Sequence, residues 1–477
     1  MQPSRAPDPA RPHIVLLAPR GEAFRNFVYS ETLPRLARQA RVTLLSVVDD
    51  DRVLAPAQAY VDRIAMLESY PENRLVTALR YLTHTAHYRW LWSQVAQNLW
   101  QWRDAVADRG WPWIRRRAWN AMVRACANRP TLELLTALDR HWSVWLRPTR
   151  DLDRIFERLG PQLVFNCSHI HGPAADLPIR IAHRSGIATA GFIFSWDNLT
   201  SRSRIFPPYD HYLVWNRGMR DQLLSMYPRI RPEQVHITGS PQFDFHFQPQ
   251  YRLSRAELCR RIGADPERPF ILYTTGMAEH FPEEHRTVEY IARLLPELEH
   301  RPQLVVRTYI KDTSRDMSEL AARRLPDVLF PEVLWERRWF TPLPEDLKVY
   351  TSLLHHAAVG INAASTVSLE LLMLDKPVIN LGFDPPGSRI PFYFRWRRHL
   401  EFDHYRPVVE SGAVAVADRP EEMLPLLRQA LAEPQRLSSQ RRAFIEAMFH
   451  HLNDGHCGAR VADRLLDLAR DRKPRSV

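Results

Sequence analysis

Short apolar runs separated by stretches of helical spacing dominate both ends of the chain. Near the N-terminus, residues 13–19 (HIVLLAP) and 42–48 (VTLLSVV) are apolar, and the stretch between them has the spacing of an amphipathic helix. This order predicts strand, helix and strand in a parallel βαβ unit. Because ligands bind at the carboxyl ends of such strands, we note Gly21 and Glu22, which directly follow the first run.

The same alternation resumes in the middle of the chain and continues almost to its end. It predicts four more strands in a first domain and at least three in a second, with a linker at residues 243–253. A chain of 477 residues is also too long for one core. The fold class is therefore α/β with two doubly wound, Rossmann-like domains, whose further strands are expected at residues 163–167, 188–194, 212–215, 235–238, 270–275, 304–307 and 378–381.

Residues 62–153 interrupt this alternation with long helical patterns, so we expect a helical insertion in the first domain. Nine of the fourteen tryptophans fall here, interleaved with arginines. Indole rings and guanidinium groups suit the headgroup zone of a membrane. Two alternatives stay open. The tryptophans can pack inside the insertion or against another subunit. More remotely, they can form an aromatic platform for single-stranded nucleic acid.

Residues 360–380 (GINAASTVSLELLMLDKPVIN) predict strand, tight polar turn, helix and strand. Ser365 and Thr366 stand where the helix begins, so their hydroxyls and the free backbone N–H groups can hold a phosphate at the positive end of the helix dipole. Glu370 follows one turn later on the same face, placed to accept hydrogen bonds from a ribose. An ordinary capped helix between buried strands is the alternative.

A compact polar cluster, residues 195–202 (SWDNLTSR), follows a predicted strand of the first domain. Asp197 is the candidate general base, because a carboxylate on a rigid strand end can take the proton of an attacking hydroxyl. Glu22 is the rival base, and His169 and His171 come third. Asp197 can instead serve only a local turn or helix cap. Gly21, Ser195, Asn198 and His169 are the expected contacts of the molecule that carries this hydroxyl.

Two residues at strand ends of the second domain are candidates for phosphate binding. Gly276 follows a strand and lets the backbone approach a phosphate closely. Arg307 can neutralise a pyrophosphate leaving group, or it can form an ion pair with Asp312 or a nearby helix. No Asp-x-Asp pair stands at a suitable strand end, so we expect no metal.

Four stretches resemble GT-B-type glycosyltransferases, particularly bacterial surface-polysaccharide transferases and CDP-glycerol glycerophosphotransferases, and they follow one another along the chain as in those proteins. They are residues 360–380, the Gly-x-Pro-x-x-Asp turn at 239–244, the strand end at 304–312 and the Asp-Gly start of the last helix at 454–460. Thr308 and Tyr309 replace the Pro-His usual in such proteins, so a histidine contact to the donor phosphate is not carried over.

The resemblance implies an acceptor-binding domain at residues 1–245, a nucleotide-donor domain at 246–445 and a last helix, 446–477, that packs back on the first domain. Gly276, Arg307, Asn362, Ser365, Thr366 and Glu370 are the implied donor contacts. Asn362 stands eight residues before Glu370, where many retaining enzymes carry a glutamate. The reaction is therefore expected to invert the anomeric carbon, without metal or other cofactor and in the cleft between the domains.

From these features we expect a glycosyltransferase that moves a sugar from a nucleotide-sugar donor to a surface glycan or glycolipid. A polyol-phosphate transferase, a UDP-sugar 2-epimerase and a non-catalytic glycan-synthesis scaffold are the alternatives. The net charge of +11 permits contact with anionic membrane, but no nucleic-acid-binding motif is present. Four scattered cysteines and the lack of a long apolar run indicate a cytoplasmic protein, peripheral on the membrane if the insertion binds lipid.

Overall fold

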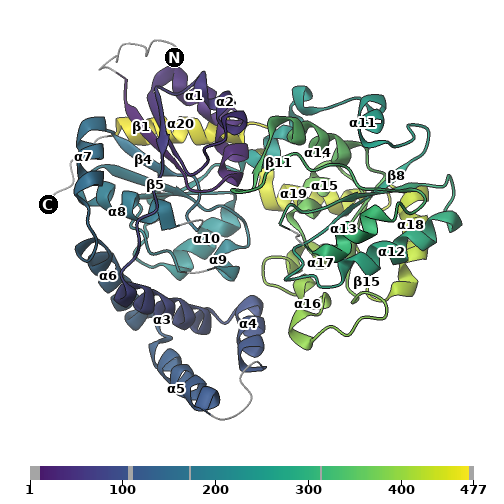
Figure 1. Cartoon of the computed structure of the whole chain (residues 1–477), viewed down its shortest axis with the longest axis horizontal. Coiled ribbons are helices and arrows are strands. Elements are labelled where there is room, and N and C mark those ends of the chain that lie inside the picture. The colour runs from purple at the N-terminus through teal and green to yellow at the C-terminus, as the bar shows by residue number, and fades with distance from the viewer. Residues whose placement is uncertain (1–10, 106–110, 171–172, 203, 312–313, 472–477) are drawn as a thin grey trace. The chain divides into compact units, whose positions relative to one another are not determined.

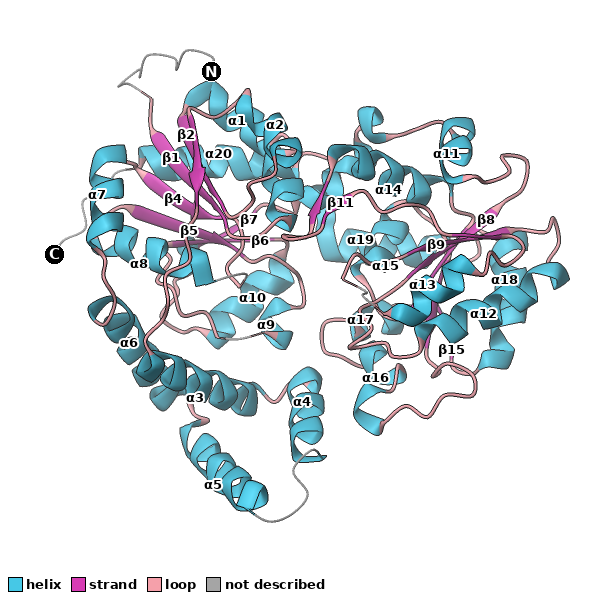
Figure 2. Cartoon of the chain, viewed as in Figure 1, coloured by secondary structure: helices cyan, strands magenta, loops and turns pink. Residues whose placement is uncertain are grey.

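The computed structural model describes residues 11–105, 111–170, 173–202, 204–311 and 314–471, and it divides the chain into two compact units. Unit 1 comprises residues 1–242 and 456–477, and unit 2 comprises residues 243–455. Each unit has a parallel β-sheet with helices on both of its faces (Figures 1 and 2). The two doubly wound, Rossmann-like domains expected from the sequence are confirmed.

The sheet of unit 1 has seven parallel strands in the order β3-β2-β1-β4-β5-β6-β7. The interior strand β1 is buried along its whole length, as expected for a parallel strand covered on both faces. The strands are β1 His13–Ala18, β2 Arg41–Ser46, β3 Arg63–Met66, β4 Leu163–Asn166, β5 Ala188–Phe192, β6 His211–Val214 and β7 Val235–Ile237.

The helices of unit 1 include the last helix of the chain, which packs against the first. Thr32 of α1 donates from its hydroxyl to the Gly458 carbonyl (3.0 Å), and Arg35 pairs with Asp463 at 2.6 Å. The helices are η1 Phe24–Val28, α1 Thr32–Gln39, α2 Asp51–Gln58, α3 Arg74–Leu91, α4 Gln94–Ala105, α5 Trp111–Cys126, α6 Arg129–Trp145, α7 Arg150–Leu159, η2 Pro173–Ala175, α8 Asp176–Arg184, α9 Asn198–Ser201, α10 Arg217–Met226, η3 Pro232–Gln234 and α20 Cys457–Arg470.

The helical insertion begins later than the sequence suggested. The expectation of helices from residue 62 was wrong at its start, because Arg63–Met66 forms the edge strand β3 and the helices begin at Arg74. This strand has four residues, its two end residues are exposed, and it therefore lacks the apolar run that marks the other strands. None of the described helices is long and apolar enough to cross a bilayer.

The main sheet of unit 2 has six parallel strands in the order β10-β9-β8-β13-β14-β15. Apolar side chains from both sides of this sheet form the core of the unit. The strands are β8 Phe270–Thr274, β9 Gln303–Arg307, β10 Val328–Leu329, β13 Val359–Asn362, β14 Val378–Leu381 and β15 Ala415–Ala417, with an antiparallel pair β11 Trp335–Glu336 and β12 Thr341–Pro342.

Unit 2 begins with short 3₁₀ helices where the sequence predicted an irregular linker. Capping residues explain where longer helices start, for example Ser254, whose side chain accepts from the Glu257 N–H. The helices are η4 Pro241–Phe247, η5 Pro249–Tyr251, α11 Arg255–Ile262, α12 Glu284–Leu294, η6 Leu295–Glu297, α13 Arg315–Ala322, α14 Pro344–His356, α15 Thr366–Met373, η7 Phe392–Phe394, α16 Arg397–Leu400, α17 Arg406–Glu410, η8 Pro420–Glu422, α18 Met423–Ala432, α19 Ser438–Phe449 and η9 His450–Leu452.

Candidate functional site

Each sheet has a point where its strand order reverses, and ligands of doubly wound folds bind there. In unit 2, β8, β9 and β10 follow one another in one direction and β13, β14 and β15 in the other. We call the loops after β8 and β13 the second switch point; they contain Thr275, Gly276 and residues 363–366. In unit 1 the reversal lies between β1 and β4, so residues 19–22 and 167–169 form the first switch point.

The start of α15 at the second switch point has the geometry of a capped helix. Ser365 has extended backbone angles, and its hydroxyl accepts from the Val367 N–H at 3.2 Å, which confirms it as the N-cap. Thr366 is the first helical residue, and both side chains are half-buried. First-turn N–H groups have no partner within a helix, so this end of α15 can receive an anion.

A buried network of amides and hydroxyls holds α15 against two strands. Asn362 and Asn380 lie opposite each other at the ends of β13 and β14, and the Asn380 amide donates to the Asn362 oxygen (3.1 Å). The Ser368 hydroxyl donates to the same oxygen (3.0 Å), while the Tyr405 hydroxyl contacts Ser368 (2.7 Å) and donates to the Asn380 oxygen (2.9 Å). Burial raises the pKa of Tyr405 to about 12, so its phenol stays protonated.

Asn362 is the one member of this network with a free donor. Its side-chain Nδ2 is buried without a hydrogen-bond partner in the described part of the chain, although its oxygen accepts two bonds. A buried donor without a partner is costly, and such groups are often completed by a ligand or water. The sequence had identified Asn362 but neither Ser368 nor Asn380, whose signal is a second asparagine ending the adjacent apolar strand.

Glu370 is more deeply buried than we expected of a ribose contact. It is 3% exposed, the Tyr350 hydroxyl donates to its Oε2, and the His246 ring lies 3.4 Å from its Oε1. Tyr350 belongs to α14 and His246 to η4, so no local sequence pattern indicated either partner. A ribose would have to share this carboxylate with Tyr350 and His246, and the role of Glu370 in donor binding stays a prediction.

Gly276 and Arg307 are both engaged by protein groups. The Gly276 N–H donates to the buried Glu284 carboxylate (3.0 Å), and a Cβ at this position would overlap the Phe281 ring. Arg307 donates to Asp346 of α14 at 2.5 Å, which is the ion pair with a nearby helix that the sequence left open. The alternative partner Asp312 lies outside the described residues. Close packing and an ion pair thus account for both residues in this structure, and their donor contacts stay predictions.

The first switch point has ionisable side chains instead of amides. Glu22, which follows Gly21 after β1, is 8% exposed and pairs with Arg20 at 2.6 Å. His169 follows β4, and its Nδ1 lies 3.2 Å from the Phe192 carbonyl. Burial lowers the pKa of His169 to about 3, although that carbonyl and the Asp197 carboxylate favour the protonated ring. His171 lies outside the described residues.

Asp197 lies in a tight turn after β5, the strand next to β4. Its carboxylate accepts from the Ser201 hydroxyl (2.5 Å) and the Asn198 amide (3.3 Å). The Asn198 oxygen in turn accepts from the Ser195 N–H at 2.8 Å. The local hydrogen bonding that the sequence left open is therefore present, but through side chains rather than the backbone. Asp197 remains half-buried, and its role as a base stays a prediction.

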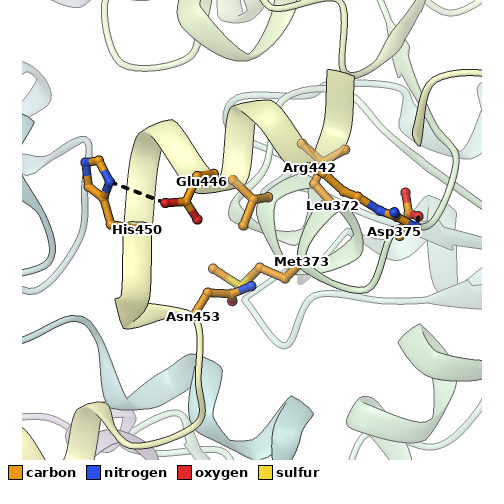
Figure 3. A pocket seen from close by; sticks show the side chains of 8 residues that line it. Leu372, Met373, Asp375, Arg442, Glu446, His450 and Asn453 are labelled. Atoms are coloured by element: carbon orange, nitrogen blue, oxygen red, sulfur yellow. Dashed lines mark hydrogen bonds and ion pairs between the residues drawn. The ribbon is translucent and has the colours of Figure 1, made fainter. Parts of the chain in front are cut away.

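A pocket of about 270 Å³ lies elsewhere in unit 2, at the opposite end of α15 from Ser365 (Figure 3). It includes none of the residues that the sequence singled out. Glu446 and His450, which line it, lie 3.6 Å apart. Among the described residues, no group of three or more His, Cys, Asp or Glu side chains is placed to hold a metal ion. The other lining residues are Leu372, Met373, Asp375, Arg442, Ile445 and Asn453.

Comparisons with known proteins identify the fold. No protein-family model matches the chain, and no curated protein matches it. Among solved structures, a UDP-N-acetylglucosamine 2-epimerase is 14% identical with a TM-score of 0.54, covering 97% of both chains. A Neisseria meningitidis UDP-GlcNAc 2-epimerase solved with UDP-GlcNAc bound is 11% identical, with a TM-score of 0.54 over 95% of this chain and 99% of that one.

A Rickettsia africae glycosyltransferase is also similar, at 9% identity and a TM-score of 0.51 over 97% of this chain and all of that one. At these identities the likeness establishes the fold alone, which is the GT-B fold expected from the sequence. Because this fold is shared by epimerases and glycosyltransferases, the likeness does not distinguish the two activities.

Proposed function

We propose that the protein is a glycosyltransferase that moves a sugar from a nucleotide-sugar donor to a surface glycan or glycolipid. The observation that carries the proposal is the second switch point. There the capped start of α15 lies beside buried Asn362, whose side-chain Nδ2 has no partner among the described residues. Helix N–H groups suit the diphosphate of a nucleotide. The amide of Asn362 provides one more donor to the same ligand.

The transfer we propose is a direct displacement at the anomeric carbon. The acceptor oxygen forms a bond to that carbon while the bond from the carbon to the phosphate oxygen breaks, and the nucleoside diphosphate leaves with the electron pair. The acceptor proton passes to a carboxylate, for which Asp197 is the first candidate and Glu22 the second. Gly21, Ser195, Asn198 and His169 are proposed to orient the acceptor. The configuration of the sugar is inverted.

The proposed reaction uses no metal, so protein groups must stabilise the negative charge of the leaving diphosphate. The positive end of α15 supplies this stabilisation, with the Thr366 N–H and the Ser365 hydroxyl directed to the phosphate. Arg307 contributes only if it exchanges its ion pair with Asp346 for the ligand. Gly276 has a structural part in the loop, because its N–H already donates to Glu284.

Epimerisation of a UDP-sugar is the second candidate, because two of the similar structures described above are UDP-GlcNAc 2-epimerases. Such a reaction needs the same nucleotide site but no acceptor. It also requires acid and base groups beside the sugar ring. Glu22 and Asp197 are two carboxylates at strand ends of unit 1 that suit this chemistry, so the residues alone do not decide between the two reactions.

One experiment separates these functions. Full-length protein is titrated calorimetrically with UDP, CDP, GDP and dTDP, and the base that binds then selects a panel of labelled nucleotide sugars. A glycosyltransferase releases nucleoside diphosphate and glycosylates an added acceptor, whereas an epimerase converts the donor to its C2 epimer without acceptor. Transfer from CDP-glycerol indicates a polyol-phosphate transferase. Nucleotide binding without any turnover indicates a scaffold, and failure of every nucleotide to bind refutes the proposal.

A further inference from the structure

Helix α5 of the insertion has an inner face that is fully accounted for. Val123 is buried in a small core with residues of α3, α4 and α6, and Trp119 packs against that core. The Trp119 ring also stacks on Tyr81 with 5.1 Å between ring centroids. Asn120 donates to Asp104 of α4 at 3.3 Å. These contacts fix which face of α5 points outwards, and they confirm that part of the tryptophan-rich insertion packs internally.

The outer face of α5 combines exposed apolar side chains in one stripe. Ile114 is 51% exposed and Met122 42%, and the exposed alanines 118, 121 and 125 lie between and beyond them at helical spacing. Trp113 beside this stripe is 40% exposed. Figure 1 shows α5 beyond α3, at a distance from the strands of unit 1. The described part of unit 1 therefore leaves this apolar stripe in solvent.

The charge on the same helix has one sign. Arg115, Arg117 and Arg124 are exposed, and the 16 residues of α5 include no Asp or Glu. The Arg117 guanidinium lies 4.3 Å from the centre of the Trp113 ring. The fourth arginine, Arg116, faces inwards towards α4, where its guanidinium lies 3.7 Å from Asp104. The exposed surface thus offers three cations and an apolar stripe about 17 Å long, without a counter-charge of its own.

We propose that the outer face of α5 binds the surface of an anionic lipid bilayer, with Trp113, Ile114 and Met122 in the headgroup zone and the arginines on lipid phosphates. This arrangement matches helices that lie in the plane of a membrane interface. A second copy of the chain fits poorly, because a two-fold interface would bring these arginines together without acidic partners. Single-stranded nucleic acid would need several stacking rings, whereas this stripe is mainly aliphatic.

This surface function is independent of the proposed catalysis, since it uses none of the residues at either switch point. It would place a transferase where lipid-linked acceptors are found. The expected binding falls with rising salt, because salt screens the arginine attraction but not the burial of apolar side chains.

The test is sedimentation of the full-length protein with vesicles of phosphatidylcholine alone and of an equal mixture with phosphatidylglycerol. We expect binding to the mixed vesicles only. Replacing Arg115, Arg117 and Arg124 by Gln should weaken it about 100-fold, at about fivefold for each arginine. The pair Trp113→Ser and Ile114→Ser should weaken it at least about tenfold.

Matched controls separate a specific face from general charge or stickiness. Arg154→Gln, Arg229→Gln and Arg315→Gln remove the same charge from exposed sites outside α5. Trp145→Ser removes a tryptophan that is 74% exposed on α6. Both controls should bind vesicles like the wild type, and all variants should melt at the wild-type temperature because every changed side chain is exposed.

Four results would overturn the proposal. The first is that wild-type protein stays in the supernatant with anionic vesicles at low salt. The second is that the charge control weakens binding as much as the α5 arginine variant does. Concentration-dependent dimerisation that Trp113→Ser and Ile114→Ser abolish would instead assign the face to a second copy. Tight salt-dependent binding of single-stranded RNA by the same arginines, without vesicle binding, would assign it to nucleic acid.

Discussion

The two switch points of this protein are built from opposite chemistry. The second has uncharged hydroxyls and amides around the start of a helix, with Ser365 and Asn362 as its principal donors and acceptors. The first has Glu22 and His169, and Asp197 follows the adjacent strand β5; all three are ionisable and held by neighbouring groups. Neutral donors attract an anion without carrying a net charge that must be neutralised when the site is empty. Ionisable side chains are suited instead to moving a proton.

In the proposed transfer, the two similar sheets divide one reaction between nucleotide binding and proton movement. A parallel sheet positions loops at its strand ends whatever their sequence, so the side chains of those loops decide between binding and chemistry. The predictions below test that division, because changes at the second switch point should alter binding and changes at the first should alter turnover.

The largest effect is expected at Asp197. If this carboxylate takes the acceptor proton, Asp197→Asn should lower kcat by about 10²–10⁴-fold, while nucleotide affinity stays near the wild-type value. Steady-state kinetics and calorimetry on the same preparation measure both. The matched variant is Glu22→Gln, which tests the rival base. Full turnover in Asp197→Asn together with loss in Glu22→Gln would transfer the role to Glu22, and a product of retained configuration would contradict direct displacement.

Glu370 tests whether the second switch point binds the nucleotide. Glu370→Gln removes the charge but keeps the shape, and if the carboxylate holds the ribose it should weaken nucleoside diphosphate binding by about 1.5–3 kcal/mol. Tyr350→Phe is the control, because it removes only the hydroxyl that donates to Glu370. A purely structural role predicts a lower melting temperature in both variants, with unchanged affinity in the folded protein. That result would remove Glu370 from the donor site.

Much of the fold and part of the candidate site followed from the sequence. Buried parallel strands are continuous apolar runs, so most strand ends were located, and Ser365 was identified as a cap from local chemistry. The edge strand Arg63–Met66 was missed because exposure at its ends weakens that signal. Asn380 was missed despite a visible signal, since an asparagine ends each of two adjacent apolar strands.

Other features of the site depend on contacts that sequence patterns do not encode. His246 and Tyr350 meet Glu370 from distant segments, so only the three-dimensional structure reveals that its carboxylate is engaged. The same is true of Gly276. Its backbone packs closely against the Phe281 ring and donates a hydrogen bond to Glu284, so it is not open to a phosphate in this structure. Local sequence therefore predicts which atoms stand at a strand end more readily than which of them are free for a ligand.

The ionisable character of the first switch point should appear in the pH dependence of stability. The pKa of His169 is about 3 in the folded protein and 6.5 for the free side chain, because burial opposes its charge. Between these values the unfolded chain binds one more proton, so the free energy of unfolding falls as pH falls, by up to about 1.4 kcal/mol per pH unit. No such slope arises from Ser365 or Asn362, which do not titrate.

Denaturant unfolding of wild type and His169→Gln between pH 6 and pH 4 measures this slope. This range lies about 0.5–2.5 pH units below the pKa of the free side chain. The variant should have the flatter dependence. His141, an exposed histidine of α6, is the matched control, and His141→Gln should leave the slope unchanged. Equal slopes for wild type and His169→Gln would contradict the idea that this buried ring stays neutral.

The smallest effect is expected at the cap of α15, where a matched cap on another helix allows a direct comparison. Ser365→Ala removes the hydroxyl that accepts from the Val367 N–H and should cost about 1 kcal/mol of stability. Ser254 caps α11 in the same way, through the Glu257 N–H, so Ser254→Ala should cost a similar amount. Only Ser365→Ala should also weaken nucleoside diphosphate binding, because only that helix start lies at a switch point. Calorimetry on both variants measures the difference, and equal affinities would leave Ser365 with a structural role alone.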